Sequence, residues 1–91
     1  MKIKNMTSSS GREVPNQFII ETKGATYFQS YKTVIAKKFW PKNKMMRIYL
    51  DKNYWDYSVT TGRYRNDFLG EGIADTRKKI ESGEYKLKDL N

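Results

Sequence analysis

The sequence predicts a small α+β domain in which a four- or five-stranded, mainly antiparallel sheet and two short helices enclose one core. Segments that alternate apolar and polar residues fill most of the chain before residue 52 and recur near its end. Between them, two segments have the apolar spacing of helices, and a glycine follows each one. The length of 91 residues suits one domain. We expect residues 1–15 to be a flexible basic arm and residues 16–91 to be the folded domain.

The folded domain is expected to begin with two strands joined by a tight turn. In Asn16–Thr22, Phe18 and Ile20 share one face and Ile19 lies opposite with Glu21, which is typical of a strand. Lys23 and Gly24 follow, and glycine adopts the positive φ that a tight hairpin turn needs. Ala25–Ser30 is therefore predicted to be the return strand of a hairpin.

A second hairpin is predicted in the next segment. Thr33–Trp40 begins with β-branched residues and ends with aromatic ones, which favours a strand. Pro41–Lys44 is typical of a turn, because proline cannot donate a ladder hydrogen bond. Met45–Asp51 alternates apolar residues with Arg47 and Tyr49, so we expect a strand with one buried face.

An aromatic corner precedes the first predicted helix. Tyr64 and Phe68 are four residues apart and share one face of this helix. Gly70 is expected to end it in the left-handed conformation. Three residues are candidate N-caps: Ser58, Thr60 and Thr61.

A second short helix and a last strand complete the prediction. Ile73–Ser82 has Asp75 in its first turn and Lys78 toward its end, which complements the helix dipole. Gly83 is the stop signal. Glu84–Leu90 alternates again, and we expect it to add a strand to one edge of the sheet.

Positive charge is concentrated in one part of the chain. Lysine and arginine number 18 against 10 acidic residues, and residues 32–47 contain six basic residues and no acid. Such a local charge attracts anionic surfaces, and interleaved aromatic rings are typical of single-stranded nucleic-acid binding. We therefore predict a site for nucleic acid or another anionic partner formed by Lys37, Lys38, Trp40, Lys42, Lys44 and Arg47, with Arg63 and Arg65 as its extension. The alternative is a lysine-rich hairpin that is only solvated.

The corner from Tyr54 to Tyr57 has two interpretations. Its rings either plug the junction between sheet and helix or form an exposed patch that contacts a partner. The sequence leaves both open.

Several functional classes are disfavoured by what the chain lacks. Cysteine and histidine are absent, which removes disulfides, the common zinc sites and the commonest general base. No acidic residues have the spacing of metal ligands, so we expect no metal, no cofactor and no enzymatic activity. No apolar run is long enough to span a membrane, and we expect a soluble intracellular protein.

The segments GREVPNQFII, YFQSY, IYLD, WDYS and TTGRYRNDFLG lie between residues 11 and 70, and GEYKLKDLN closes the chain. Together they resemble a family of short uncharacterised proteins of tailed bacteriophages and prophages. The resemblance implies a location in the cytoplasm of a bacterial host cell. It implies no established activity and no site residue.

We therefore expect a small non-enzymatic accessory protein whose basic hairpin binds nucleic acid or a nucleic-acid-handling host protein. One alternative is an inhibitor of a host enzyme or defence system, for example an anti-CRISPR protein, that acts by direct protein contact. Another is a structural or assembly component of a phage particle.

Overall fold

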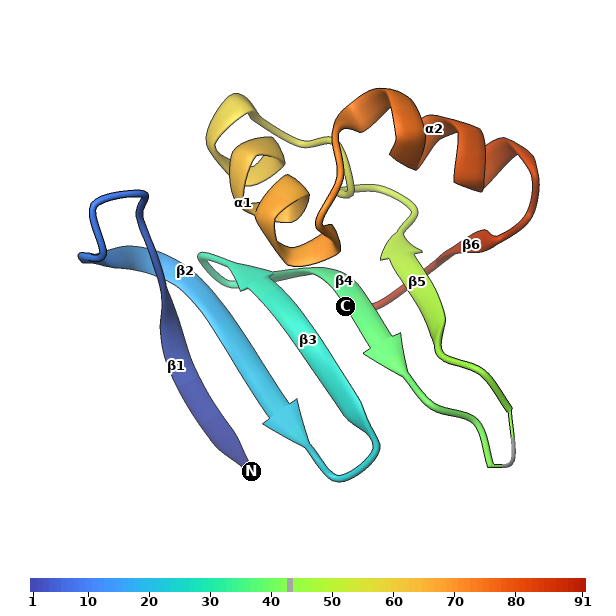
Figure 1. Ribbon diagram of the computed structural model, residues 1–91, viewed down its shortest axis with the longest axis horizontal. Helices are drawn as coiled ribbons and strands as arrows, with labels where there is room; N and C mark the ends of the chain where they lie inside the picture. Colours follow the sequence, from blue (N-terminus) through green and yellow to red (C-terminus); the bar gives the residue numbers. More distant parts are fainter. Residues whose placement is uncertain (43) are drawn as a thin grey trace.

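The protein folds as a six-stranded mixed sheet with two helices packed on one face, as Figure 1 shows. The computed structural model describes residues 1–42 and 44–91. Asn43, which belongs to the turn predicted at Pro41–Lys44, lies outside the described residues. The elements are β1 Lys2–Thr7, β2 Glu13–Thr22, β3 Ala25–Ser30, β4 Thr33–Phe39, β5 Arg47–Asp51, α1 Val59–Leu69, α2 Ile73–Glu81 and β6 Tyr85–Lys88.

The strands follow one another across the sheet in chain order, from β1 to β6. The first five strands are antiparallel neighbours, whereas β6 runs parallel to β5. Both helices lie in the connection between β5 and β6, and a crossover of this kind returns the chain in the same direction. The prediction of a small α+β domain with two helices is confirmed. The prediction of four or five strands is wrong, because the sheet has six.

The additional strand comes from the segment that we expected to be a flexible arm. Residues 2–7 form β1, which pairs with β2 from Lys2 opposite Glu21 to Thr7 opposite Glu13. The small residues between the two strands make a turn, in which Gly11 has φ of 83° and donates to the Ser8 carbonyl. The cluster of serines and glycine that suggested mobility is therefore the turn of a hairpin.

One face of the sheet forms the core with the helices. Phe28 at the centre of β3 is fully buried, and its ring centroid lies 5.9 Å from that of Phe68 on α1. The pairing of β3 with β4 shifts by one residue after Phe28, so that two consecutive residues of β4, Ile35 and Ala36, are both fully buried. The cluster is completed by Ile48, Leu50, Tyr64 and Tyr85.

Both ends of α1 are formed as the sequence predicts. Ser58 is the N-cap, and its hydroxyl accepts a hydrogen bond from the Thr61 amide at 3.1 Å. Gly70 ends the helix with φ of 72°, in the left-handed region. None of the helices in the described part of the chain is long and apolar enough to cross a membrane.

The corner before α1 divides its aromatic residues between core and surface. Trp55 is half-buried and packs against the core, whereas Tyr57 is 68 % exposed. Tyr54 stands edge-on to Tyr57, with ring centroids 5.6 Å apart. The corner is therefore part plug and part exposed aromatic surface.

Candidate functional site

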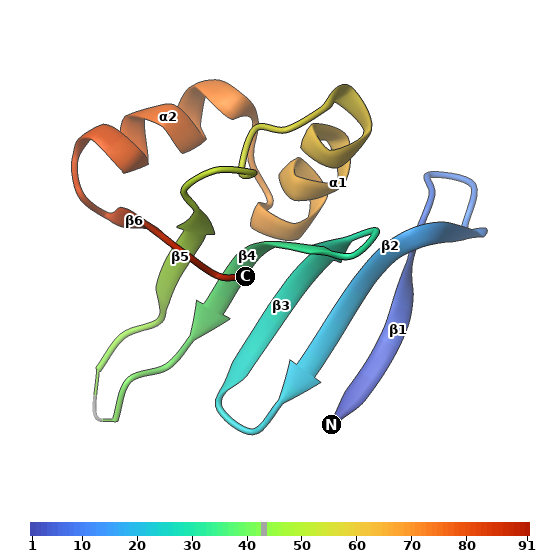
Figure 2. The same ribbon diagram turned by 180° about the vertical axis from the view of Figure 1, so that it is seen from behind.

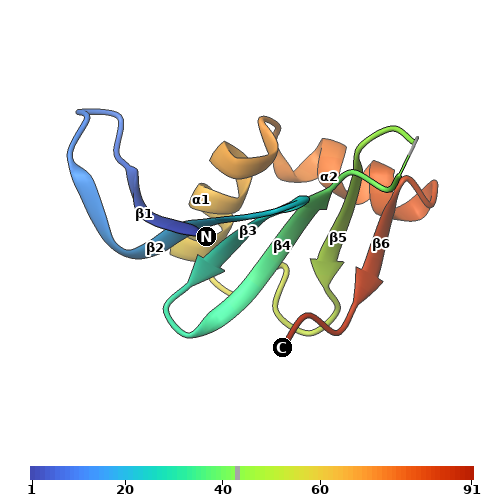
Figure 3. The same cartoon turned by 90° about the horizontal axis from the view of Figure 1, so that it is seen from below.

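The helices cover only one face of the sheet, as Figure 3 shows, and leave the other face open to solvent. Side chains alternate between the two faces of each strand, so residues next to the core positions point to the uncovered side. The strand register places one row of these residues across all six strands: Ile3, Ile20, Tyr27, Lys37, Tyr49 and Lys86. Phe39 and Arg47 form a neighbouring pair on the same side. We call this surface the open face.

Rings and ammonium groups contact one another on the open face. Lys37 Nζ lies 5.6 Å from the Tyr27 ring centroid and 5.0 Å from that of Phe39. The Phe39 ring meets the Tyr49 ring edge-on, with centroids 4.7 Å apart. Lys88 Nζ then lies 5.6 Å from the Tyr49 centroid. We call Tyr27, Lys37, Phe39, Tyr49 and Lys88 the aromatic–lysine ladder.

The rings of the ladder do not belong to the core. Tyr27, Phe39 and Tyr49 are each half-buried, and none of them packs in the core cluster on the helix side. They are held by the sheet backbone and by one another, so their orientation is set before any ligand binds. A rigid row of partly exposed rings is a platform on which planar groups can stack.

The open face carries several positive charges over β4 to β6. Within the part of the chain that the structure describes, Lys37, Arg47, Lys86 and Lys88 make no ion pair. The carboxylate of β5, Asp51, is fully buried. Its oxygens accept hydrogen bonds from the amides of Asn53, Tyr54 and Leu90 and from Asn91 Nδ2. The cations of the open face are therefore available to an anionic ligand.

More positive charge lies in the connection between β4 and β5, at one end of these strands. Lys42 and Lys44 are exposed in this connection, and Trp40 is 53 % exposed beside them. The Trp40 amide donates to the Gly24 carbonyl, so the β2–β3 turn lies at the same end of the strands. Figure 1 shows both connections at that end of the strands, and Figure 2 shows the same arrangement from behind.

Five of the eight residues predicted for the site lie on or beside the open face. Lys37 and Arg47 are on the open face, and Trp40, Lys42 and Lys44 are in the adjoining connection. Arg63 is exposed, but it lies on α1, which covers the opposite face of the sheet.

Lys38 was predicted in the site, but the structure places it on the helix side. Its Nζ donates to the Phe68 carbonyl at 2.5 Å and lies 4.4 Å from the Phe68 ring centroid. Burial lowers the pKa of Lys38, and the nearby Glu71 carboxylate opposes this effect. Adjacent residues of a strand point to opposite faces, so Lys37 and Lys38 cannot serve the same surface.

Arg65 was predicted on the outer surface of the helix, and this prediction is wrong because the residue is only 1 % exposed. Its Nη1 donates to the Trp55 carbonyl at 2.8 Å and to Asp56 Oδ1 at 3.3 Å. Its Nη2 donates to Asn66 Oδ1 at 3.1 Å, and the guanidinium lies 5.4 Å from the Trp55 ring centroid. The corner folds over this side of α1, so that Arg65 holds the corner to the helix.

A second polar cluster connects α2 to β6 on the helix side. The Glu71 carboxylate accepts hydrogen bonds from Thr76 Oγ1 at 2.7 Å, Lys79 Nζ at 2.6 Å and Tyr85 Oη at 2.9 Å. Burial raises the pKa of Glu71, but the three hydrogen bonds outweigh it and hold that pKa below its usual value. Burial and the hydrogen bond to Glu71 raise the pKa of Tyr85 to about 12. Each of these polar side chains has a hydrogen-bond partner within the cluster, so we assign the cluster a role in stabilising the fold.

The sequence interpretation missed several residues of the open face, namely Tyr27, Phe39, Tyr49, Lys86 and Lys88. The sequence contained a signal for them, because aromatic and basic residues alternate with the core residues along these strands and so point to the other face of the sheet. Their proximity depends on the order of the strands, in particular on β6 lying next to β5. No group of three or more potential metal ligands gathers within residues 1–42 and 44–91.

Comparison of the chain with known protein families gives one match. Residues 1–86 match the model of a family of unknown function, DUF8033. Comparisons with curated proteins and with solved structures find no significant match. With 86 of its 91 residues covered by this model, the chain belongs to the family of unknown function DUF8033.

Proposed function

We propose that the protein binds single-stranded nucleic acid across the open face of its sheet and has no enzymatic activity. The observation that carries the proposal is the aromatic–lysine ladder, in which three rings and two ammonium groups lie in contact with one another over β3 to β6. The resemblance to short phage proteins supports a role in the cytoplasm of an infected bacterium.

Each part of the ladder has a role in this binding. Unpaired bases stack on the rings of Tyr27, Phe39 and Tyr49, and each stacked base contributes about 1–3 kcal/mol. The ammonium groups and Arg47 lie between and beside the rings, where they contact the phosphates that connect the bases. Lys42 and Lys44 extend the positive surface beyond the end of β4.

The arrangement favours single strands over duplexes. Bases in a duplex are stacked on one another and present only their edges, so they cannot stack on the rings of the open face. Every base has a π-face, and stacking therefore tolerates any sequence. We expect weak sequence preference, because the open face offers cations and rings rather than paired donors and acceptors.

The test compares a fluorescently labelled single strand of about 12 nucleotides with the duplex of the same sequence. The wild-type protein should bind the single strand more tightly. A Phe39→Leu, Tyr49→Leu double variant keeps apolar side chains but removes the rings, and its affinity should fall by roughly tenfold to 100-fold. Tyr54→Leu is the matched control, because this ring lies at the corner and not on the open face. Failure to bind at low salt, or a preference for the duplex, would contradict the proposal.

A second candidate function is inhibition of a host enzyme or defence system by direct protein contact. The corner favours it, because Tyr57 is 68 % exposed and Val59 is 92 % exposed at the start of α1. A pull-down from host lysate treated with nuclease separates the two functions. A partner that stays bound after this treatment, and is lost with Tyr57→Ser, supports protein contact at the corner.

A further inference from the structure

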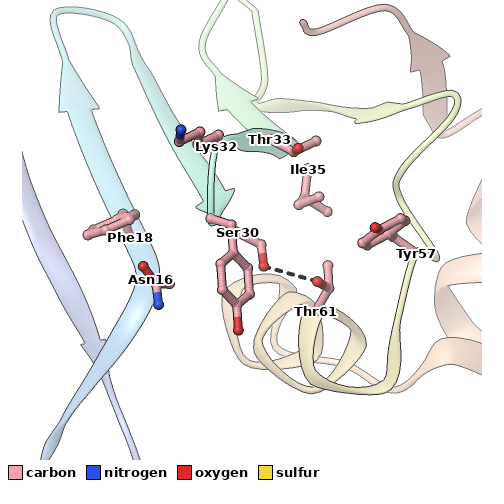
Figure 4. Close-up of a pocket in the computed structure, with 9 residues that line it drawn as sticks. Asn16, Phe18, Ser30, Lys32, Thr33, Ile35, Tyr57 and Thr61 are labelled. Carbon is pink, nitrogen blue, oxygen red and sulfur yellow. Dashed lines mark hydrogen bonds between the residues drawn. The ribbon is translucent and has the colours of Figure 1, made fainter.

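A hollow of about 690 Å³ opens where the β3–β4 turn meets the start of α1. This volume lies within the range of small-molecule sites. Figure 4 shows Phe18 and Tyr57 on opposite sides of the hydrogen bond between the Ser30 and Thr61 hydroxyls, whose oxygens are 3.0 Å apart. The lining is thus apolar and aromatic, with a pair of hydroxyl groups between its walls.

Two residues of the lining have unusual backbone conformations. Asn16 has φ of 66° and Tyr31 has φ of 56°, both in the left-handed region. The Tyr31 amide donates to the Asn16 carbonyl at 2.7 Å, so the two conformations are coupled. A left-handed conformation is unfavourable for tyrosine, and such strain concentrates at functional sites. Here it holds a ring that is 57 % exposed at the edge of the hollow.

The hollow lies mainly on the helix side, where Ser30, Ile35 and Thr61 line it, and Phe18 connects it to the open face. Phe18 pairs with Gln29 between β2 and β3, on the same side of the sheet as Tyr27's row, and it also lines the hollow. Lys32 lies at the rim, and none of the lining residues is acidic. A nucleic-acid strand that leaves the ladder toward the β3–β4 turn would meet aromatic walls and an ammonium group together.

We infer that the hollow receives one unstacked base of the bound strand, with Lys32 contacting the adjacent phosphate. This inference rests on the proposed function and adds a second subsite to it. The base is held between aromatic walls, as flipped or splayed bases are in other proteins. The Asn16 side chain lines the hollow and supplies hydrogen-bonding groups for the edge of the base, whereas the Ser30 and Thr61 hydroxyls are buried and bond to each other.

The first test uses adenosine 5′-monophosphate, which is too short to follow the ladder. In an amide NMR titration, signals of Tyr31, Lys32 and Thr61 should shift. Tyr31→Asn should weaken binding roughly tenfold, because it removes the ring while asparagine tolerates a positive φ. Tyr54→Asn is the matched control and should bind as wild type does.

The second test concerns Lys32. Adenosine without its phosphate should bind the wild type more weakly than the monophosphate does, and Lys32→Ala should remove that difference. Lys78→Ala on α2 is the control for the loss of one exposed lysine.

The outcomes separate the inference from the proposed function. If the 12-nucleotide strand binds through the ladder but the monophosphate leaves the hollow signals unchanged, the inference is overturned and the proposed function stands. If neither probe binds at low salt, both are overturned. A thermal melt of Tyr31→Asn that matches the wild type shows that a loss of binding is not a loss of folding.

Discussion

The salt dependence of binding can be predicted from the position of the charges on the open face. We consider the double substitution Lys86→Gln, Lys88→Gln on β6. Both side chains are exposed, and neither makes an ion pair in the described part of the chain. The substitutions therefore leave the fold intact. They remove two of the six cations that lie on or beside the open face; the six are Lys37, Lys42, Lys44, Arg47, Lys86 and Lys88.

The magnitude follows from counterion release. For single strands the logarithm of the affinity falls with the logarithm of the salt concentration with a slope of about −0.7 per phosphate contacted. Six contacts therefore give a slope of about −4, and four contacts give about −3. Between about 50 and 200 mM salt, the wild type should lose roughly 300-fold in affinity and the double variant only about 50-fold.

Fluorescence anisotropy with a labelled single strand at three salt concentrations measures both slopes. The control is Arg63→Gln, Lys78→Gln, which removes the same charge from exposed positions on α1 and α2. This control should keep the wild-type slope, because both residues lie on the helix side of the sheet. Equal slopes for the two double variants would refute the reasoning, since binding would then follow net charge rather than the open face.

Three further predictions concern stability. Arg65→Met should lower the free energy of unfolding by about 2–4 kcal/mol in urea titration, because it removes two hydrogen bonds that hold the corner to α1 and a third to Asn66 within the helix; a loss below about 0.5 kcal/mol would contradict this role. Asp51→Asn should lower the free energy of unfolding by about 2–3 kcal/mol in the same assay, because an amide nitrogen replaces a buried oxygen that accepts backbone hydrogen bonds. Asn91→Ala should lower it by only about 1 kcal/mol. The pKa of Tyr85 is raised to about 12, so its contribution to stability is present at neutral pH and is lost between about pH 10 and pH 12. The difference in the free energy of unfolding between wild type and Tyr85→Phe should therefore shrink over that range. A constant difference would argue against the hydrogen bond to Glu71.

Local structure was predictable wherever one short segment carried the signal. Ser58 and Gly70 lie where α1 begins and ends, because capping depends only on the adjacent backbone. The alternation in β5 identified the buried side chains Ile48 and Leu50. β1 was missed because its strand is mostly polar, and its apolar residues Ile3 and Met6 gave no clear alternation.

The candidate site was harder to predict because it depends on contacts between distant segments. Lysine density identified Lys37 and Arg47, but density does not distinguish the two faces of a strand, so Lys38 was included wrongly. The burial of Arg65 results from the corner folding over α1, which no local pattern indicates. Lys88 reaches the Tyr49 ring only because β6 lies beside β5 in the sheet.

The most direct test of the central claim is to observe which aromatic rings contact a bound single strand. Aromatic side-chain NMR signals should be recorded during titration with an oligonucleotide at low salt. We predict that the signals of Tyr27, Phe39 and Tyr49 shift together, while those of Tyr64 and Phe68 in the core on the helix side stay in place. Shifts confined to Tyr54 and Tyr57 at the corner, with the ladder unchanged, would contradict the assignment of the open face as the binding surface.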